Sequence, residues 1–124
     1  MAVRFPLTVS QKQKILYVNP PPPEELTAFG DRYMEAGLLH DSLEFYSVAK
    51  DDSSLRRLVE ASVESADLLL FQNTFRALRE QPPIEKVRDI YERALALGKK
   101  VEADRIEAHF LSESKSRNRG AHHD

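Results

Sequence analysis

Histidine is the residue type that most often binds metal ions or transfers protons near neutral pH, and this sequence contains four. His40 stands at the expected start of one helix, and His109 on the outer or side face of another. The segment His122–Asp124 has the ligand chemistry to hold a metal weakly, but we expect a surface tail there. No two histidines stand four residues apart on an expected helix together with a third ligand. The sequence therefore predicts no metal site.

Paired carboxylates are the other residues whose spacing suits catalysis. Glu24–Glu25 and Asp51–Asp52 each stand where a helix is expected to begin, and acids there accept from free backbone N–H groups and favour the positive end of the helix dipole. Acid–base catalysis would need them in a pocket that shifts their pKa values. The chain has only four glycines, with neither a Gly-rich phosphate loop nor a GxSxG nucleophile motif. We predict no catalytic residue and no cofactor, and expect that the protein is not an enzyme.

Composition places the chain among ordinary soluble domains. Of its 124 residues, 41% are hydrophobic and 31% are charged, and the net charge of −2 gives no overall bias toward nucleic acid. The absence of cysteine excludes disulfides and thiolate metal sites and fits a reducing cytoplasm. The N-terminus lacks the apolar stretch of a signal peptide, and Leu68–Phe71 is far shorter than the ~20 residues that cross a bilayer. We expect a soluble, cytoplasmic protein.

Apolar side chains spaced three and four residues apart predict about six short helices. Pro23, followed by two glutamates, marks the first start, and Gly37 and Gly98 mark two of the ends. The expected helices cover approximately residues 23–36, 40–50, 55–63, 66–79, 84–97 and 101–110, with a weak stretch and a short break expected within 62–66. Short loops make sequential helices antiparallel. The predicted fold is all-α, with three stacked helical hairpins over residues 24–112, as in a fragment of an α-solenoid.

The two ends of the chain lack this helical pattern. Residues 1–23 are predicted to form an extended or flexible arm, because apolar residues from Val3 to Val9 alternate with a strand-like period of two. The arm ends in a stiff polyproline break, Pro20–Pro23. We expect it either to pack loosely or to dock on a partner. Residues 113–124 are polar and patternless, and we predict a disordered tail.

Small and aromatic residues follow a regular spacing in the first expected hairpin, with small residues where two helices would cross closely. They are Gly30, Tyr33, Gly37, Ser42, Tyr46 and Ala49. This order resembles one tetratricopeptide repeat, a helix–turn–helix of ~34 residues. The last hairpin repeats the order with defects at Tyr91 and Glu107, and the central hairpin does not match. The chain thus looks like a degenerate tetratricopeptide-like helical-repeat protein over about half of its length.

This resemblance implies protein–protein binding in a groove lined by the first helix of each hairpin. Carried over position by position, it places Thr27, Asp31, Met34 and Glu35 on that surface. The basic and amide residues that clamp a peptide carboxylate in some family members are missing, because Thr27 and Asp31 stand in their places. An acidic C-terminal peptide is therefore not the ligand that we expect.

A second candidate surface is the apolar run Leu68–Phe71. Four consecutive apolar residues cover more than one face of a helix, so either neighbours bury that helix on two sides or it exposes an apolar strip. The exposed alternative makes Leu70 and Phe71 contacts for a partner or for a second copy of the chain.

Taken together, these features favour a non-catalytic protein–protein interaction or adaptor module. Its partner would be another protein, or a second copy in a homo-oligomer, with no membrane involved. One alternative is a small helical ligand-binding protein or enzyme that uses His40 or His109 with nearby acids. Another is a nucleic-acid accessory protein that uses the basic arm of residues 1–23. Residues 24–112 do not favour nucleic acid, because they hold 18 acidic and 12 basic residues.

Overall fold

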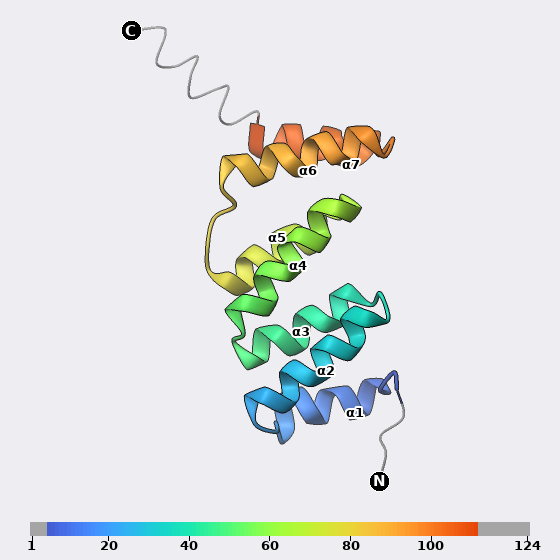
Figure 1. Cartoon of the computed structure of the whole chain (residues 1–124), viewed down its shortest axis with the longest axis vertical. Helices are drawn as coiled ribbons and strands as arrows, with labels where there is room; N and C mark the ends of the chain where they lie inside the picture. Colours follow the sequence, from blue (N-terminus) through green and yellow to red (C-terminus); the bar gives the residue numbers. More distant parts are fainter. Residues whose placement is uncertain (1–4, 112–124) are drawn as a thin grey trace, which may run out of the picture. The chain divides into compact units, whose positions relative to one another are not determined.

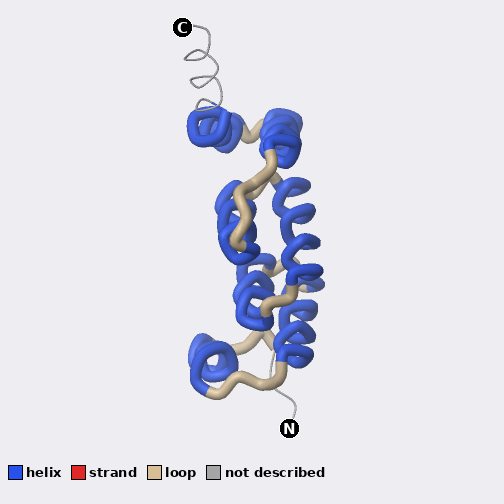
Figure 2. Tube along the Cα trace, turned by 90° about the vertical axis from the view of Figure 1, so that its left-hand side faces the viewer, coloured by secondary structure: helices blue, strands red, loops and turns tan. Residues whose placement is uncertain are grey.

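The computed structural model describes residues 5–111, and this part of the chain is helical, with no strand (Figure 1 and Figure 2). Its elements are α1 (Val9–Gln13), η1 (Lys14–Val18), α2 (Pro23–Glu35), α3 (Leu39–Ala49), α4 (Asp52–Ser65), α5 (Leu68–Leu78), α6 (Ile84–Ala96), α7 (Lys100–Ile106) and η2 (Glu107–Leu111). The labels η1 and η2 denote single π-helical turns. The predicted all-α class is confirmed. The predicted tail at residues 113–124 lies outside the described residues.

Two compact units make up the chain, residues 1–58 and 59–124. Within the described residues, the first unit contains α1, η1, α2, α3 and the first half of α4. The second contains the remainder of α4 and every element from α5 to η2. Each unit has its own buried residues and is described by itself.

Helices α2 to α7 lie close to the six predicted positions, and the local signals explain their ends. Pro23 occupies the start of α2, with Glu24 and Glu25 in the first turn. Gly37 (φ 78°) follows the end of α2, and Gly98 (φ 73°) follows the end of α6. Glycine adopts this left-handed backbone at little steric cost, so it ends a helix readily. The predicted starts and stops at these residues are confirmed.

Three other helices end in the same left-handed conformation without a glycine. Lys50, Ala66 and Arg79 have φ angles of 55°, 51° and 58°. At each end, the next backbone N–H donates to a carbonyl five residues earlier, as Glu80 does to Phe75 at 3.1 Å. This hydrogen bond closes the helix and offsets part of the steric cost of the side chain. The break expected within 62–66 falls at Ala66, because α4 continues to Ser65.

The segment predicted as an extended arm is helical over Val9–Val18, so that prediction is wrong there. The Thr8 hydroxyl accepts the backbone N–H of Gln11 (3.1 Å), and the Gln11 side chain accepts that of Thr8 (3.0 Å). This reciprocal capping box starts a helix and interrupts the strand-like alternation. Leu16 is then buried at 2% exposure in the core of the first unit. Its packing against that core holds the segment in place.

Aromatic rings connect α2 to α3 in the first unit. The core contains Leu16, Leu26, Tyr33 and Phe45. The Phe45 ring stacks on the rings of Phe29 and Tyr33, with centroids 5.4 Å apart in both pairs. The core of this unit is therefore a stack of rings against which Leu16 and Ile15 of η1 pack.

Gly30 allows α2 and α3 to approach closely. A Cβ atom placed on Gly30 would lie 2.5 Å from Cε1 of Tyr46, well inside the ~3.5–4.0 Å of carbon contacts. Tyr46 is fully buried, so its ring has no open space into which to move. Tyr46 can therefore pack in this position only because residue 30 has no side chain.

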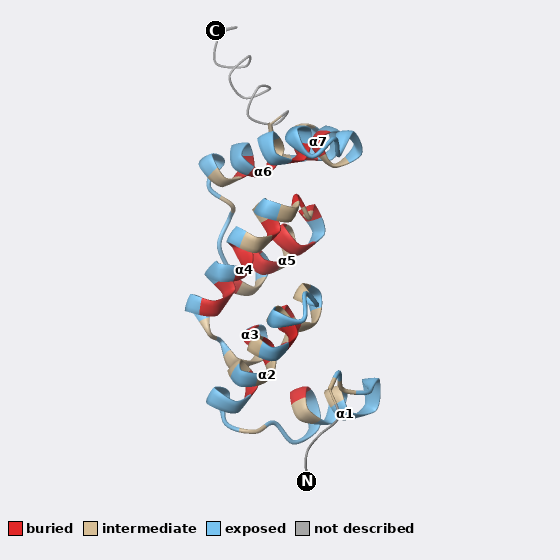
Figure 3. Ribbon diagram, turned by 45° about the vertical axis from the view of Figure 1, so that its right-hand side comes forward, coloured by how far each residue is buried: buried red, intermediate tan, exposed pale blue. Residues whose placement is uncertain are grey.

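In the second unit, α5 supplies the largest buried side chains, and buried residues recur along α4 and α5 (Figure 3). The Phe71 ring lies edge-on to those of Phe75 (5.0 Å) and Phe110 (6.3 Å), which links α5 to η2. The buried apolar residues contributed by the other elements of this unit are Val59, Ala66, Val87, Ile90, Ala94, Ala103 and Ile106. Within residues 5–111, no helix combines the length and the apolar character that crossing a membrane requires.

Candidate functional site

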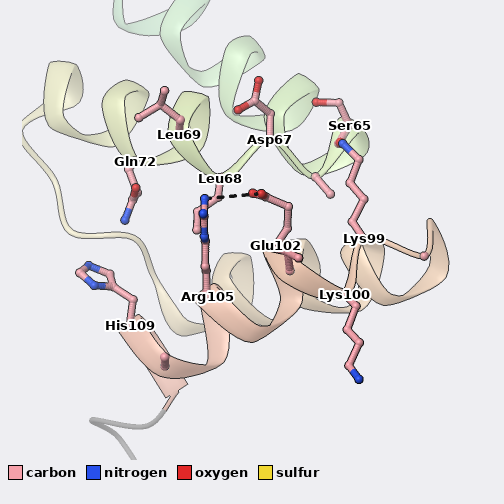
Figure 4. Close-up of a pocket in the computed structure, with 14 residues that line it drawn as sticks. Ser65, Asp67, Leu68, Leu69, Gln72, Lys99, Lys100, Glu102, Arg105 and His109 are labelled. Atoms are coloured by element: carbon pink, nitrogen blue, oxygen red, sulfur yellow. Dashed lines mark hydrogen bonds and ion pairs between the residues drawn. The ribbon is translucent and has the colours of Figure 1, made fainter.

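An open groove on the second unit has a volume of about 1080 Å³ (Figure 4). One wall is the start of α5 with the turn before it, and the other is α7 with η2. It is lined by Ser65, Ala66, Asp67, Leu68, Leu69, Gln72, Gly98, Lys99, Lys100, Val101, Glu102, Arg105, Ala108 and His109. The groove has about the size of a small-ligand or peptide site.

Apolar side chains are exposed on both walls. Leu69 on α5 has 59% of its surface exposed, and Val101 on α7 has 63%. Leu68 is buried at 7% exposure beside them. A helix turns by 100° per residue, so α5 can bury Leu68 and Leu70 while Leu69 projects outward. Each of the two helices that line the groove, α5 and α7, therefore contributes one exposed apolar side chain.

Charged residues line the same walls, with three cations against two acids. Arg105 Nη1 lies 3.9 Å from Glu102 Oε1, and the Arg105 side chain is 69% exposed. Lys99 Nζ donates to the Ser65 carbonyl at 2.7 Å, so its charge is held at the end of α4. The Lys100 side chain extends away from α5, whereas Arg105 points toward it (Figure 4). Arg105 is therefore the cation best placed to meet a group that enters the groove, since its pairing is exposed and weak.

His109 stands where the groove meets a second cavity of about 370 Å³. Its ring lies edge-on to Phe110, with centroids 4.6 Å apart. The proposed use of His109 in acid–base catalysis would require a carboxylate within hydrogen-bond reach. Among the described residues, no carboxylate is hydrogen-bonded to the His109 ring. His40 is exposed at the start of α3, in the other unit. Within residues 5–111, no group of three metal-ligating side chains is close enough to hold an ion.

Two of the predicted partner contacts are buried. Leu70 and Phe71 are both 0% exposed, because they lie on the inner face of α5 in the core of the second unit. Neither can touch a partner, so the prediction is wrong for both. Within the run Leu68–Phe71, only Leu69 reaches the surface.

Asp31 and Met34, two of the residues that the repeat resemblance places on a binding surface, contact the same buried phenol. The hydroxyl of Tyr46 donates to Asp31 Oδ1 and lies 3.7 Å from the Met34 sulfur. Arg57 Nη2 lies 3.3 Å from the same Asp31 oxygen. Burial and the bond to Asp31 raise the pKa of Tyr46 well above its ordinary value of 10.0. Asp31 therefore joins α2, α3 and α4 within the first unit.

Thr27 takes part in a second set of bonds, centred on Asp51. The Asp51 carboxylate accepts from the Thr27 hydroxyl (3.1 Å), the Ser54 backbone N–H (3.1 Å) and the Ser54 hydroxyl (2.8 Å). Burial by itself raises the pKa of Asp51, but the bonds from Ser54 and then Thr27 outweigh it and hold the pKa below 3.8. Asp51 thus caps α4 and ties it to α2.

The structure brings together Thr27, Asp31 and Met34 of the four predicted groove residues. Their polar atoms bond within the first unit, which gives these residues a role in its stability. Glu35 is exposed at the end of α2 and apart from this network. Whether any of the four meets a partner stays a prediction.

Comparison with known proteins found no match to the chain among protein-family models, curated proteins or solved structures. The groove residues Leu69, Val101 and Arg105 were not predicted from the sequence. The sequence does show the apolar run at 68–71. Which residue of that run is exposed can be told only once the buried side of α5 is known.

Proposed function

We propose that the protein is a non-catalytic interaction module, and that the groove between α5 and α7 binds a segment of another protein. The supporting observation is that Leu69 of α5 and Val101 of α7 both line the groove and are exposed. Ligand-binding sites are typically concave and lined by apolar side chains with a few polar groups, as this groove is. The exposed Arg105 would favour a ligand that carries an acidic group.

The chemistry of the walls defines the ligand. An apolar side chain would cover Leu69 and Val101, and a nearby carboxylate would compete with Glu102 for Arg105. Both apolar residues are about three-fifths exposed, so covering them contributes roughly 2–4 kcal/mol in total. That is a factor of about 30 to 1000 in affinity. The binding energy thus comes from apolar contact, and the carboxylate selects the ligand.

We also propose that sequential helices pair as antiparallel hairpins, in the manner of degenerate tetratricopeptide repeats. Two observations support this. The connections between α2 and α3 and between α6 and α7 are short, which favours antiparallel neighbours. Gly30 of α2 lies against Tyr46 of α3, as the small–aromatic spacing of that family requires. Thr27, Asp31, Met34 and Glu35 would then lie on the first helix of one hairpin.

The test of the groove is selection from a random peptide library displayed on phage, with the full chain immobilised. We expect enrichment of peptides that carry an apolar residue close to an acid. Leu69→Ser together with Val101→Ser should weaken their binding about tenfold or more, and Arg105→Glu should remove the preference for acids. The matched control is Leu95→Ser, because Leu95 is 52% exposed on α6 and does not line the groove.

Two outcomes would overturn the proposal. In the first, the selected peptides bind the Leu69→Ser, Val101→Ser variant as tightly as the unchanged chain. In the second, light scattering finds a dimer that this variant converts to a monomer, which would make a second copy of the chain the occupant of the groove.

A further inference from the structure

The four consecutive prolines at 20–23 have no part in the groove, and their conformation follows from covalent geometry. The proline ring restricts φ, and a residue that precedes proline is excluded from the helical region. Pro20, Pro21 and Pro22 each meet both conditions, so they are confined to the polyproline II conformation. Pro22 has φ −54° and ψ 153°, which lies in that region.

This turn is held at both ends. η1 ends at Val18, and Pro23 starts α2. A polyproline II helix has three residues per turn and rises ~3.1 Å per residue, so Pro20 and Pro23 share one edge about 9 Å apart. The chain is therefore ordered on both sides of the turn, and binding would require little further loss of conformational entropy.

The prolines and their flanks are open to solvent. Pro20, Pro22 and Pro23 are exposed, and Pro21 is half-buried. Just before the prolines, Tyr17 is 62% exposed and Val18 is 75% exposed. Tyr17 also borders a surface cavity of about 400 Å³ in the first unit.

Acidic residues follow the prolines directly. Glu24 and Glu25 are exposed in the first turn of α2. The exposed surface therefore runs from an apolar flank, through a preformed polyproline turn, to a negative charge. Aromatic-lined grooves in proline-recognition domains bind this kind of preformed helix, and basic residues at one end of such a groove would favour the acids.

We propose that Pro20–Pro23 is a ligand for a proline-recognition domain that has an aromatic-lined groove and a basic residue at one end. The test uses three such domains of different fold, an SH3, a WW and an EVH1 domain. Each is titrated into the full ¹⁵N-labelled chain and followed by NMR. We expect at least one to bind saturably, with the largest shifts at the amides of Asn19 and Glu24, which flank the prolines.

Variants separate this site from the rest of the chain. Pro20→Ala together with Pro21→Ala should weaken binding tenfold or more, because two proline rings are removed and residue 20 no longer precedes a proline that restricts its backbone. Pro82→Ala is the matched control, since it alters the short proline pair before α6 and should leave affinity unchanged. Leu69→Ser with Val101→Ser should also leave it unchanged, which distinguishes this site from the groove.

Failure of all three domains to bind the unchanged chain would overturn the proposal. So would equal binding of the Pro20→Ala, Pro21→Ala variant, with its fold verified by circular dichroism. The chemical shift map of the unchanged chain is independent of any variant, and shifts confined to residues far from the prolines would also refute it.

Discussion

Replacing Gly30 by alanine tests the close packing of α2 against Tyr46 of α3. The added Cβ would lie 2.5 Å from Cε1 and 2.7 Å from Cδ1 of Tyr46, where carbon atoms normally stay ~3.5–4.0 Å apart. The Tyr46 ring is fully buried and its hydroxyl is bonded to Asp31. The strain must therefore be relieved by moving α2 away from α3.

Two opposing effects set the size of the change. Overpacking of this kind typically costs 1–3 kcal/mol. Alanine in a helix interior regains about 0.5–1 kcal/mol relative to glycine, because it restricts the unfolded chain more. We therefore expect Gly30→Ala to lower the free energy of unfolding by up to about 2.5 kcal/mol.

Urea unfolding, followed by circular dichroism, measures this free energy. Ala28→Gly, at an exposed position of the same helix, calibrates the helix-propensity contribution. In a Tyr46→Leu background, the ring atoms in question are gone, and Gly30→Ala should become neutral or stabilising. If Gly30→Ala raised the stability of the unchanged chain by the full helix-propensity gain, the close contact between α2 and α3 would be refuted.

Three further predictions follow from the helix ends and the polar network. Arg79→Gly should stabilise the chain by up to about 1 kcal/mol in urea unfolding, because an L-residue at φ 58° is strained; a loss of stability would contradict the left-handed cap. Asp51 has its pKa held below 3.8 in the folded chain. Its contribution to the free energy of unfolding is therefore present above that pH and is lost as the pH falls through the folded pKa. Asp51→Asn should therefore destabilise the chain at neutral pH and differ less from it in acid, whereas a difference independent of pH would refute this. Tyr46 has its pKa raised above 10.0, so its contribution to the free energy of unfolding is lost as the pH rises through the folded pKa. In an ultraviolet titration, Tyr46→Phe should remove a phenol that ionises only above pH 10.0.

The sequence alone was sufficient to place helices α2 to α7. Pro23 with its glutamates, Gly37 and Gly98 act within one or two turns of chain, so their effect can be read from neighbouring residues. The same holds for the polyproline turn, because proline rings restrict the backbone without any tertiary contact. The capping box of Thr8 and Gln11 is also a local signal, and it outweighs the strand-like alternation of apolar residues up to Val9.

Tertiary packing decided which side chains are exposed. The run Leu68–Phe71 is equally apolar throughout, and only the neighbours of α5 determine that Leu69 alone reaches the surface. The left-handed ends at Lys50 and Arg79 have no glycine to announce them, since the closing hydrogen bonds and packing outweigh their steric cost. The histidines and paired acids that first suggested chemistry stand at helix ends and surfaces, whereas the groove unites residues far apart in sequence. Local sequence sets backbone conformation, but a binding site requires distant residues to meet, and only the packing of the helices brings them together.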